Sequence, residues 1–542
     1  MNSNLAALDW MVIALYFIIT FGVAIYATMR ERAAKQTSAQ YFLAGRDAGW
    51  FLVGGSLFAS NIGSEHLVGL AGTGAASGVA VAQFEILASL ILLLLGWLFV
   101  PFYLTSKVFT MPEFLERRYS TGARWYLAVI SIIGYVLTKI SVTIAAGGIV
   151  FEALMGIDFW TGALVVVVVT GIYTIFGGLR AVLYTDLMQM FVLIGGAIAV
   201  TLVGLSSIGG WDGLRSQVGP GFMSMWKPMS DPNFPWTGIL FGAPILGIWY
   251  WCTDQFIVQR VLAAKNQDHA RRGTIFAGYL KVLPLFIFVL PGLIAYVLAQ
   301  QGRLTLANPD QALPTLVASL LPVGLRGLVV AGLLAALMSS LSSVFNSTST
   351  LLTIDVYRKL KPDTSERALV LFGQGATAVL VALGLLWIPL MKLVSGQLYQ
   401  YLQSVQAYIA PPIAAVFLLG ILWRRLNATG AMAALITGFV LGMGRLIAEL
   451  GKQGLSGALR TYADINFLHF AVLLFIVCSF VLVVVSLMTP PPPAEKVEGL
   501  TFARAPAGAI TEPSGAPTTK RRDMLLSFGL ILCVLAVWLY FS

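Results

Sequence analysis

The chain alternates between long apolar runs and short breaks that carry charged residues, glycine or proline. A run of about 20 apolar residues can cross the hydrocarbon core of a bilayer, about 30 Å thick, as a helix. The alternating segments of about ten residues that are typical of transmembrane β-barrels do not occur. We therefore predict an all-α polytopic membrane protein with about 14 transmembrane helices. They are expected near residues 9–27, 50–73, 79–104, 123–152, 159–177, 181–207, 235–259, 273–299, 327–356, 367–390, 395–423, 427–450, 466–488 and 524–541.

The composition agrees with this pattern, because 58% of the 542 residues are hydrophobic and only 11% are charged. A soluble domain needs far more polar surface. The net charge of +10 does not indicate nucleic-acid binding, since no basic face on a folded domain is apparent. With the N-terminus placed outside, the inside loops hold 24 Lys and Arg residues and the outside loops hold 7. This bias predicts a multi-pass protein of the cell inner (plasma) membrane with both termini extracellular or periplasmic.

Residues 489–523 are rich in Pro, Ala, Gly and Thr, and we expect a disordered cytoplasmic linker there, before a last transmembrane helix at 524–542. Cys252, Cys478 and Cys533 all lie in apolar segments, without a disulfide framework or a CxxC metal pattern. The first apolar run lacks a basic region before it, so no cleavable signal peptide is expected.

Polar groups at membrane depth are costly unless they are paired or line a cavity, so function is expected where they gather. The first such place runs from Gly54 to His66. The glycines that follow it are Gly69, Gly72 and Gly74. Small residues suit close helix packing, but packing does not account for Asn61, Glu65 and His66 together. We favour an unwound segment that frees backbone carbonyls for a cation.

A lone carboxylate, Glu85, stands in the apolar stretch 79–88. Such a group must face a partner or a cavity. A structural ion pair and hydrogen bonds to substrate hydroxyls are both open interpretations. Further donors in spans are Lys281 and Gln403, which taken singly are more often packing or snorkelling residues.

The third place is the aromatic stretch Trp249 to Gln255, which contains Asp254 and is preceded by Pro244. Aromatic clusters near membrane ends usually form interfacial belts. A proline there removes a helix hydrogen bond. The alternative is a second broken helix whose aromatic rings stack on a sugar ring.

The fourth place is the serine-rich stretch from Ala335 to Thr350, where Ser339, Ser343 and Ser347 share one helical face. Serine hydroxyls also bond back to their own helix, but the density exceeds what that needs. Hydroxyl oxygens suit a small, hard cation.

Two gapped helices far apart indicate an internal repeat, and broken helices at matching positions in two halves point to a binding site near the bilayer midplane. The candidate copies are residues 50–207 and 235–423 with five spans each, and an odd number of spans makes the copies inverted. The remaining segments are the flanking helix and cytoplasmic loop 1–49, the extracellular loop 208–234 and the flanking helices 424–488.

Five stretches carry a resemblance to a known family: 59–66, 177–186, 249–260, 338–346 and 401–404. They are similar to the sodium:solute symporter family and, within it, to sodium/glucose cotransporters, as expected of a bacterial sodium/sugar symporter. The similarity extends from about residue 9 to 488. It implies a LeuT-type core of two inverted five-helix repeats with flanking helices.

The resemblance also implies site residues. The main sodium site would use carbonyls of Ala59, Ile62 and Ala336 with hydroxyls of Ser339 and Ser340. The sugar site would use Asn61, His66, Glu85, Lys281 and Gln403, with Tyr250 closing it from inside beside Tyr135 and Trp251. An outer gate would use Leu70, Phe84 and Tyr399.

A second sodium site is implied by Asp186, Ser342 and Ser343, because relatives that bind one sodium tend to lack the hydroxyl at position 342. Two features depart from the family. Gly247 stands where several members carry a polar side chain that touches sugar, and the loop at 208–234 is much shorter than in animal members.

The expected function is import of a monosaccharide of the glucose or galactose type, with sodium as the co-transported ion, by alternating access. The alternatives are a sodium symporter for another polyol or solute such as myo-inositol, a channel or sensor, and a membrane enzyme. We expect no enzyme, because no nucleophile–base constellation, metal-ligand spacing or phosphate loop is found. The expected partners are the sugar, sodium and the lipid bilayer, without nucleic acid or an obligate protein partner.

Overall fold

The computed structural model describes residues 5–32, 42–391, 398–502 and 517–542. Within these ranges the chain forms helices and loops with two isolated β-bridges and no strand. Eleven of the helices described are long and apolar enough to cross a membrane, and 159–171 and 238–253 form shorter apolar helices. The chain is therefore a multi-pass membrane protein, while the predicted number of 14 spans is not confirmed.

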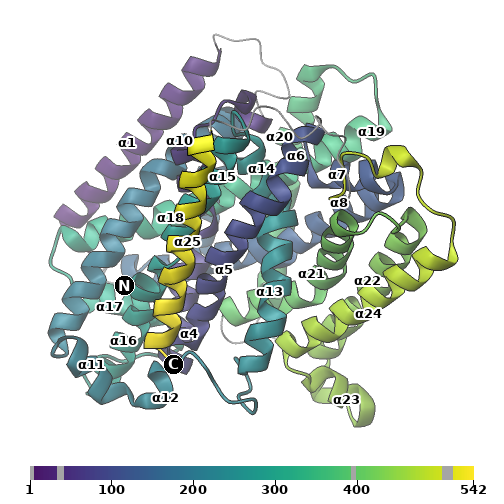
Figure 1. Cartoon of the computed structure of the whole chain (residues 1–542). Helices are drawn as coiled ribbons and strands as arrows, with labels where there is room; N and C mark the ends of the chain where they lie inside the picture. The colour runs from purple at the N-terminus through teal and green to yellow at the C-terminus, as the bar shows by residue number, and fades with distance from the viewer. Residues whose placement is uncertain (1–4, 33–41, 392–397, 503–516) are drawn as a thin grey trace.

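Most of the helices run across the molecule from its upper to its lower side in Figure 1, with α1 at one edge and α22 to α24 at the other. The α-helices are α1 (Ala7–Arg32), α3 (Trp50–Asn61), α4 (Ser64–Ser77), α5 (Gln83–Leu94), α6 (Val100–Ser106), α7 (Met111–Arg118), α8 (Thr121–Tyr135), α9 (Ser141–Val150), α10 (Phe159–Ser207), α11 (Gly210–Val218), α12 (Pro220–Met223), α13 (Ala243–Gly247), α14 (Gln255–Leu262), α15 (Gln267–Leu280), α16 (Leu290–Gln300), α17 (Ala312–Leu320), α18 (Leu325–Thr350), α19 (Arg358–Leu360), α20 (Glu366–Met391), α21 (Leu398–Leu422), α22 (Ala428–Leu450), α23 (Gly457–Asp464), α24 (Phe467–Met488) and α25 (Pro517–Tyr540).

Short 3₁₀ and π segments extend or join several of these helices. Those used below are η4 (Val136–Ile140), η7 (Ile248–Thr253) and η9 (Pro309–Gln311). The spans expected separately at 159–177 and 181–207 fall within one helical element, α10. The two expected gaps are present, between α3 and α4 and between η7 and α14.

Helix α18 lies at the centre of the molecule and packs against α1, α3, α10 and α20. Its apolar residues occur all round the helix, as expected of a helix that is enclosed on every side. The N-terminal end of α18 is capped from α1, because the Asp9 carboxylate accepts the N–H groups of Gly324 at 2.7 Å and Gly327 at 2.8 Å. Arg326 completes this contact with an ion pair to Asp9 at 3.0 Å.

Part of the expected linker is folded, so the prediction of disorder is wrong for residues 494–502. Lys496 donates to the Glu116 carbonyl at 2.8 Å, and the Phe502 N–H donates to the Ile421 carbonyl at 2.9 Å. The Phe502 ring also packs edge-on against Phe102, with centroids 5.1 Å apart. Burial of apolar side chains by this segment offsets its low helix and strand propensity. Residues 503–516 lie outside the described residues.

The last helix, α25, begins at Pro517, seven residues before the predicted start. Asp523 anchors it, because this carboxylate pairs with Arg271 at 2.8 Å and with Arg272 at 3.1 Å, both on α15. A buried carboxylate needs such partners. The helix therefore extends beyond its apolar run to bring Asp523 to these arginines.

Helix α22 packs against α21 at a point where α21 contains Pro411 and Pro412. Pro412 has no N–H, so the Tyr408 carbonyl loses its helix donor. Gly442 of α22 lies against this carbonyl, and a Cβ on Gly442 would overlap the Tyr408 oxygen and lie 3.0 Å from the Tyr408 carbonyl carbon. The small residue is needed for the close approach of the two helices.

We predict that Gly442→Ala destabilises the protein by about 1–3 kcal/mol through overpacking. Gly444→Ala is the matched control, because a Cβ on Gly444 meets nothing within 4 Å in the same helix. The control should be neutral or slightly stabilising, since alanine favours helix over glycine by up to about 1 kcal/mol. Thermal unfolding of the purified variants measures the difference, and equal midpoints would contradict the proposed close contact.

Candidate functional site

The first gap interrupts the helix that would otherwise join α3 and α4. Ile62 adopts φ −81° and ψ 82°, and Gly63 is extended. The Gly63 N–H bonds the Asn61 carbonyl at 3.0 Å, which leaves the Ala59 carbonyl without its usual helix donor. Ser340 of α18 donates to the neighbouring carbonyl of Ser60 at 3.4 Å. The gap therefore turns backbone oxygens of α3 toward the serines of α18.

The second gap is centred on Asp254, whose extended backbone (ψ 128°) separates η7 from α14. Its carboxylate accepts the Phe256 N–H at 3.4 Å and caps α14. It also accepts the Tyr135 hydroxyl and pairs with the Lys139 ammonium, which lies 3.8 Å from the Phe256 ring centroid and 4.5 Å from that of Tyr250. The hydrogen bond from Tyr135 thus joins the second gap to the end of α8. The ion pair and the cation–π contacts of Lys139 join it to η4.

A chain of buried polar side chains crosses between the two gapped helices. The Lys281 ammonium donates to Asn61 Oδ1 and pairs with Glu85 Oε2. Asn61 Nδ2 donates to the Tyr250 hydroxyl at 2.8 Å, and His66 Nε2 lies 3.8 Å from Glu85 Oε1. Each group of this chain is thus partnered by another, as burial requires. The lone carboxylate Glu85 is an ion-pair partner as well as a lining residue.

These groups surround a cavity of about 50 Å³. Its walls are formed by Asn61, His66, Phe84, Glu85, Leu87, Ala88, Ile91, Lys139, Ala243, Leu246, Gly247, Tyr250, Trp251, Tyr399, Leu402, Gln403 and Gln406. One wall is polar, while the parts formed by Leu87, Ala88 and Ile91 and by Ala243, Leu246 and Gly247 are apolar. Ligand pockets for small molecules usually measure about 300–1,000 Å³, so this cavity must widen to admit a ligand of that size.

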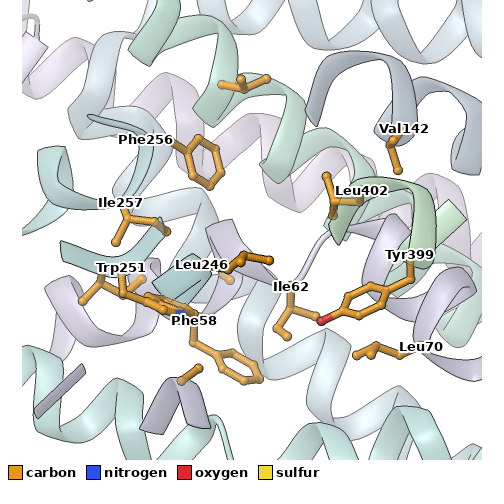
Figure 2. Packing of buried hydrophobic residues seen from close by; sticks show 14 of the residues in the cluster. Phe58, Ile62, Leu70, Val142, Leu246, Trp251, Phe256, Ile257, Tyr399 and Leu402 are labelled. Carbon is orange, nitrogen blue, oxygen red and sulfur yellow. The ribbon is translucent and has the colours of Figure 1, made fainter. Parts of the chain in front are cut away.

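Aromatic side chains cover the cavity on the side of α4. The Tyr399 hydroxyl donates to Glu85 Oε1 at 3.2 Å, and its ring packs edge-on against Phe84 and His66 with centroids 6.0 and 5.6 Å apart. In Figure 2 Leu70 lies beside the Tyr399 ring, whose hydroxyl points toward Ile62. Tyr250 and Trp251 also line the cavity, so residues expected in both gates surround it. Leu70 and Tyr135 are not among the lining residues, and Tyr135 instead donates to Asp254.

The residues expected to hold sodium lie at the first gap, where α3 and α18 meet. Ala59, Ile62, Ala336, Ser339 and Ser340 are all buried there. Ser340 reaches the α3 backbone, whereas the Ser339 hydroxyl donates to Asp186 Oδ1. A donating hydroxyl keeps its lone pairs, so Ser339 retains the oxygen that a cation would need.

The residues of the second expected sodium site are only partly brought together. Asp186 Oδ2 accepts the hydroxyls of Ser56 at 2.7 Å and Ser60 at 2.8 Å, neither of which the sequence singled out. Ser343 reaches Ser60 Oγ at 3.2 Å rather than Asp186, and Ser342 donates to the Ser339 carbonyl of its own helix.

Sequence reasoning also missed Lys139 and Gln406 as site residues, and it noted Asp254 only as part of the aromatic stretch. The signal for Lys139 was its charge inside an apolar span, which by default indicates function. Arg260 was likewise overlooked, although it is fully buried and donates to Ser60 Oγ at 3.0 Å. No signal in the sequence pairs Lys139 with Asp254, since 115 residues separate them.

Comparisons with known proteins bear on this arrangement. The model of the sodium:solute symporter family matches residues 41–438. Sodium/glucose cotransporter 1 of Oryctolagus cuniculus is 40% identical over 90% of this chain and 80% of its own length, and sodium/glucose cotransporter 4 of Danio rerio is 39% identical over 92% and 81%. The human sodium/myo-inositol cotransporter is 38% identical over 93% and 76%.

Among solved structures, a Na⁺-coupled sialic acid symporter in an outward-open state superimposes with a TM-score of 0.74. It is 22% identical and covers 90% of this chain and 99% of its own. The nucleobase-cation symporter Mhp1 superimposes with a TM-score of 0.55 at 15% identity, covering 86% and 99%. These likenesses show a common fold.

We predict that Lys281→Met destabilises the protein by about 3–5 kcal/mol, because it leaves Glu85 as a buried charge without its cation. Adding Glu85→Gln should recover most of this loss, since the charge is then removed. Lys265→Met is the control for loss of a lysine at an exposed position. Thermal unfolding in detergent measures all three, and a double variant no more stable than Lys281→Met would refute the pairing.

Proposed function

This chain belongs to the sodium:solute symporter family, and from that membership we propose that it couples sodium entry to the uptake of a monosaccharide of the glucose and galactose type. The observation that carries the proposal is the cavity between the two gapped helices, with its carboxylate, amides and aromatic rings. The names of relatives about 40% identical, the sodium/glucose cotransporters, point to the same substrate class. Membership of a symporter family makes the chain a transporter and not an enzyme.

For the sugar we propose Asn61, His66, Glu85, Lys281 and Gln403 as hydrogen-bonding residues. Their present partners are mostly one another, so sugar hydroxyls would replace bonds such as that between Asn61 and Tyr250. An exchange of one hydrogen bond for another changes the free energy little. Recognition would therefore depend on how closely the hydroxyls reproduce these positions. Trp251 and the apolar wall would receive the C–H face of the ring.

For the main sodium we propose the carbonyls of Ala59, Ile62 and Ala336 with the hydroxyls of Ser339 and Ser340. The gap supports this assignment, because it releases the Ala59 carbonyl beside α18. Sodium there would join the two repeats and order Asn61 and Ile62, which belong to the same gap. For a second sodium we propose Asp186 with Ser342 and Ser343, and the structure adds Ser56 and Ser60 as hydroxyls bonded to that carboxylate.

Transport would follow by alternating access. Outside sodium would order the pocket, Tyr399 with Leu70 and Phe84 would close over the sugar, and Tyr250 would then leave Asn61 to open the inner side. Tyr135 would follow it. One charge that crosses about 100 mV gains roughly 2.3 kcal/mol. A tenfold sodium gradient adds about 1.4 kcal/mol, so one sodium could sustain roughly 500-fold accumulation.

The bias of 24 inside against 7 outside Lys and Arg residues supports an inner (plasma) membrane location with both termini outside. The start of α1 lies beside the start of α18, where Asp9 accepts the Gly324 N–H, and the end of α25 lies beside α11, where the Trp211 ring N–H donates to the Tyr540 hydroxyl at 2.7 Å. Both contacts are with segments expected outside, which supports a location of these two helix ends on the same side of the membrane.

We predict sodium-dependent uptake of labelled glucose or galactose into proteoliposomes, lost in Glu85→Ala. Potassium replaces sodium in the control experiment, and Glu152→Ala, at an exposed position, controls for loss of a carboxylate. Uptake of myo-inositol in preference to both hexoses would show that the substrate is a cyclic polyol, as in the name of the human relative. Uptake without sodium dependence would refute the proposal.

If a second sodium binds at Asp186, Ser56→Ala should lower the Hill coefficient for sodium from near two toward one. Ser56 is chosen because its hydroxyl bonds Asp186 and it is not among the residues proposed for the main site. Thr20→Ala is the matched control, because its hydroxyl bonds Tyr16 in its own helix and no bond to Asp186 is found among the described residues. A coefficient of one in the unmodified protein, or of two in Ser56→Ala, contradicts the second site.

A further inference from the structure

Two of the glycines that follow the first gap allow other segments to pack closely against α4, one at Tyr399 and one at Asp310. We call this glycine surface of α4 the seat. Gly69 and Gly72 lie one turn apart on the same face of α4. A Cβ on Gly69 would lie 2.8 Å from Tyr399 Cβ and 3.0 Å from the Tyr399 nitrogen. A Cβ on Gly72 would lie 2.8 Å from Asp310 Cα and 3.0 Å from its nitrogen. Each added Cβ would meet backbone atoms of the neighbouring segment as well as a side-chain atom, and backbone cannot turn aside as a flexible side chain can.

Asp310 joins these two contacts. It lies in η9, in the loop between α16 and α17, and its side chain is 2% exposed. Its Oδ2 accepts the Leu398 N–H at 3.1 Å, at the first described turn of α21 and one residue before the gate residue Tyr399. Its Oδ1 is buried against Gly72 without a hydrogen-bond partner among the described residues. Asn308 fixes the segment by accepting the Asp310 N–H at 2.6 Å.

We propose that Asp310 is a positioning residue for the outer gate: seated on Gly72 and bonded to Leu398, it holds the Tyr399 end of α21 against α4 while the gate is closed. The proposal rests on the outer gate of the proposed transport cycle. When α4 and α21 separate, the seat opens and Asp310 reaches water. Because a buried carboxylate is costly unless fully bonded, the closed gate should prefer the neutral carboxylic acid.

The electrostatic surroundings agree with this dependence on protonation. Burial raises the pKa of Asp310 to about 7, and the Leu398 N–H opposes that rise. No ionisable side chain lies on α17. On α4, Glu65 and His66 stand at its start, six or more residues from Gly72. On α21, Tyr399 and Tyr401 direct their hydroxyls to Glu85 and the Leu137 carbonyl.

The direction of the pH dependence follows from the linkage between closure of the gate and protonation of Asp310. The pKa of Asp310 is raised in the closed gate and returns to its ordinary value of 3.8 in the open gate, so closure takes up a proton. Closure is favoured below about pH 7 and loses this support as the pH rises through 7. Between external pH 6 and 8 the closed-to-open ratio should change by about tenfold.

The test measures how fast a membrane-impermeant maleimide labels Ala88→Cys, which lies in the cavity wall, on intact cells without sodium or sugar. Variants are compared at the same pH, which cancels the pH dependence of the thiol itself. Asp310→Asn keeps the acceptor for Leu398 without a charge, so labelling at pH 8 should fall several-fold. The part of the pH response that comes from titration of Asp310 should be absent in this variant. Asp310→Ala lacks the acceptor, so labelling should exceed that of Asp310→Asn at both pH values.

Gly72→Ala should raise labelling severalfold, because its Cβ would displace the backbone of Asp310. The controls are Gly221→Ala, whose Cβ meets nothing within 4 Å, and Asp212→Asn at an exposed position, and both should match the parent. An Asp310→Asn variant that keeps the parent's response to pH, or a Gly72→Ala variant that labels no faster, would overturn the proposal. Labelling needs no transport, so this result and the uptake result can fail independently.

Discussion

The pairing of Glu85 with Lys281 determines how the centre of this molecule is built. A carboxylate and an ammonium are each costly to bury, and either one left alone would be far costlier than the pair. Lys281 at the end of α15 therefore lies beside α5, and its second bond, to Asn61, ties both to the gap between α3 and α4. Because each polar group is bonded to the next, the cavity is contracted, and a ligand must offer equivalent hydrogen bonds to enter it.

The two sides of the cavity are closed by different physical means. The side proposed as the inner gate is held by charge, through the Asp254–Lys139 pair, with Tyr135 and Tyr250 packed around it. The side proposed as the outer gate is held by close packing, through Tyr399 against the glycine face of α4. Charge pairs in a dry interior are strong and specific, whereas glycine contacts are lost as soon as the backbones separate. The two gates therefore respond to different conditions.

The sequence was sufficient for features that depend on local pattern. Apolar run length predicted a polytopic helical protein, and clustered glycine and polar residues predicted gaps that the structure has at Ile62–Gly63 and at Asp254. Features set by distant partners could not be predicted. Residues 494–502 have the composition of a disordered segment. They are ordered by contacts with Glu116 and Ile421, which lie far away in the sequence and so could not be foreseen. The same holds for Ser56 and Ser60, which are unremarkable serines until Asp186, about 130 residues later, lies beside them.

Asp186 links the two proposed cation sites through one hydroxyl. Ser339 donates its single proton to Asp186, so its lone pairs remain available to a cation. A hydroxyl that donates to a carboxylate becomes a stronger ligand for a cation, since hydrogen-bond chains polarise one another. The negative charge of Asp186 thus reaches the main site without a direct contact. A cation at the main site would in turn strengthen that bond, so the occupancy of one site and the charge state of the other are coupled by the same proton.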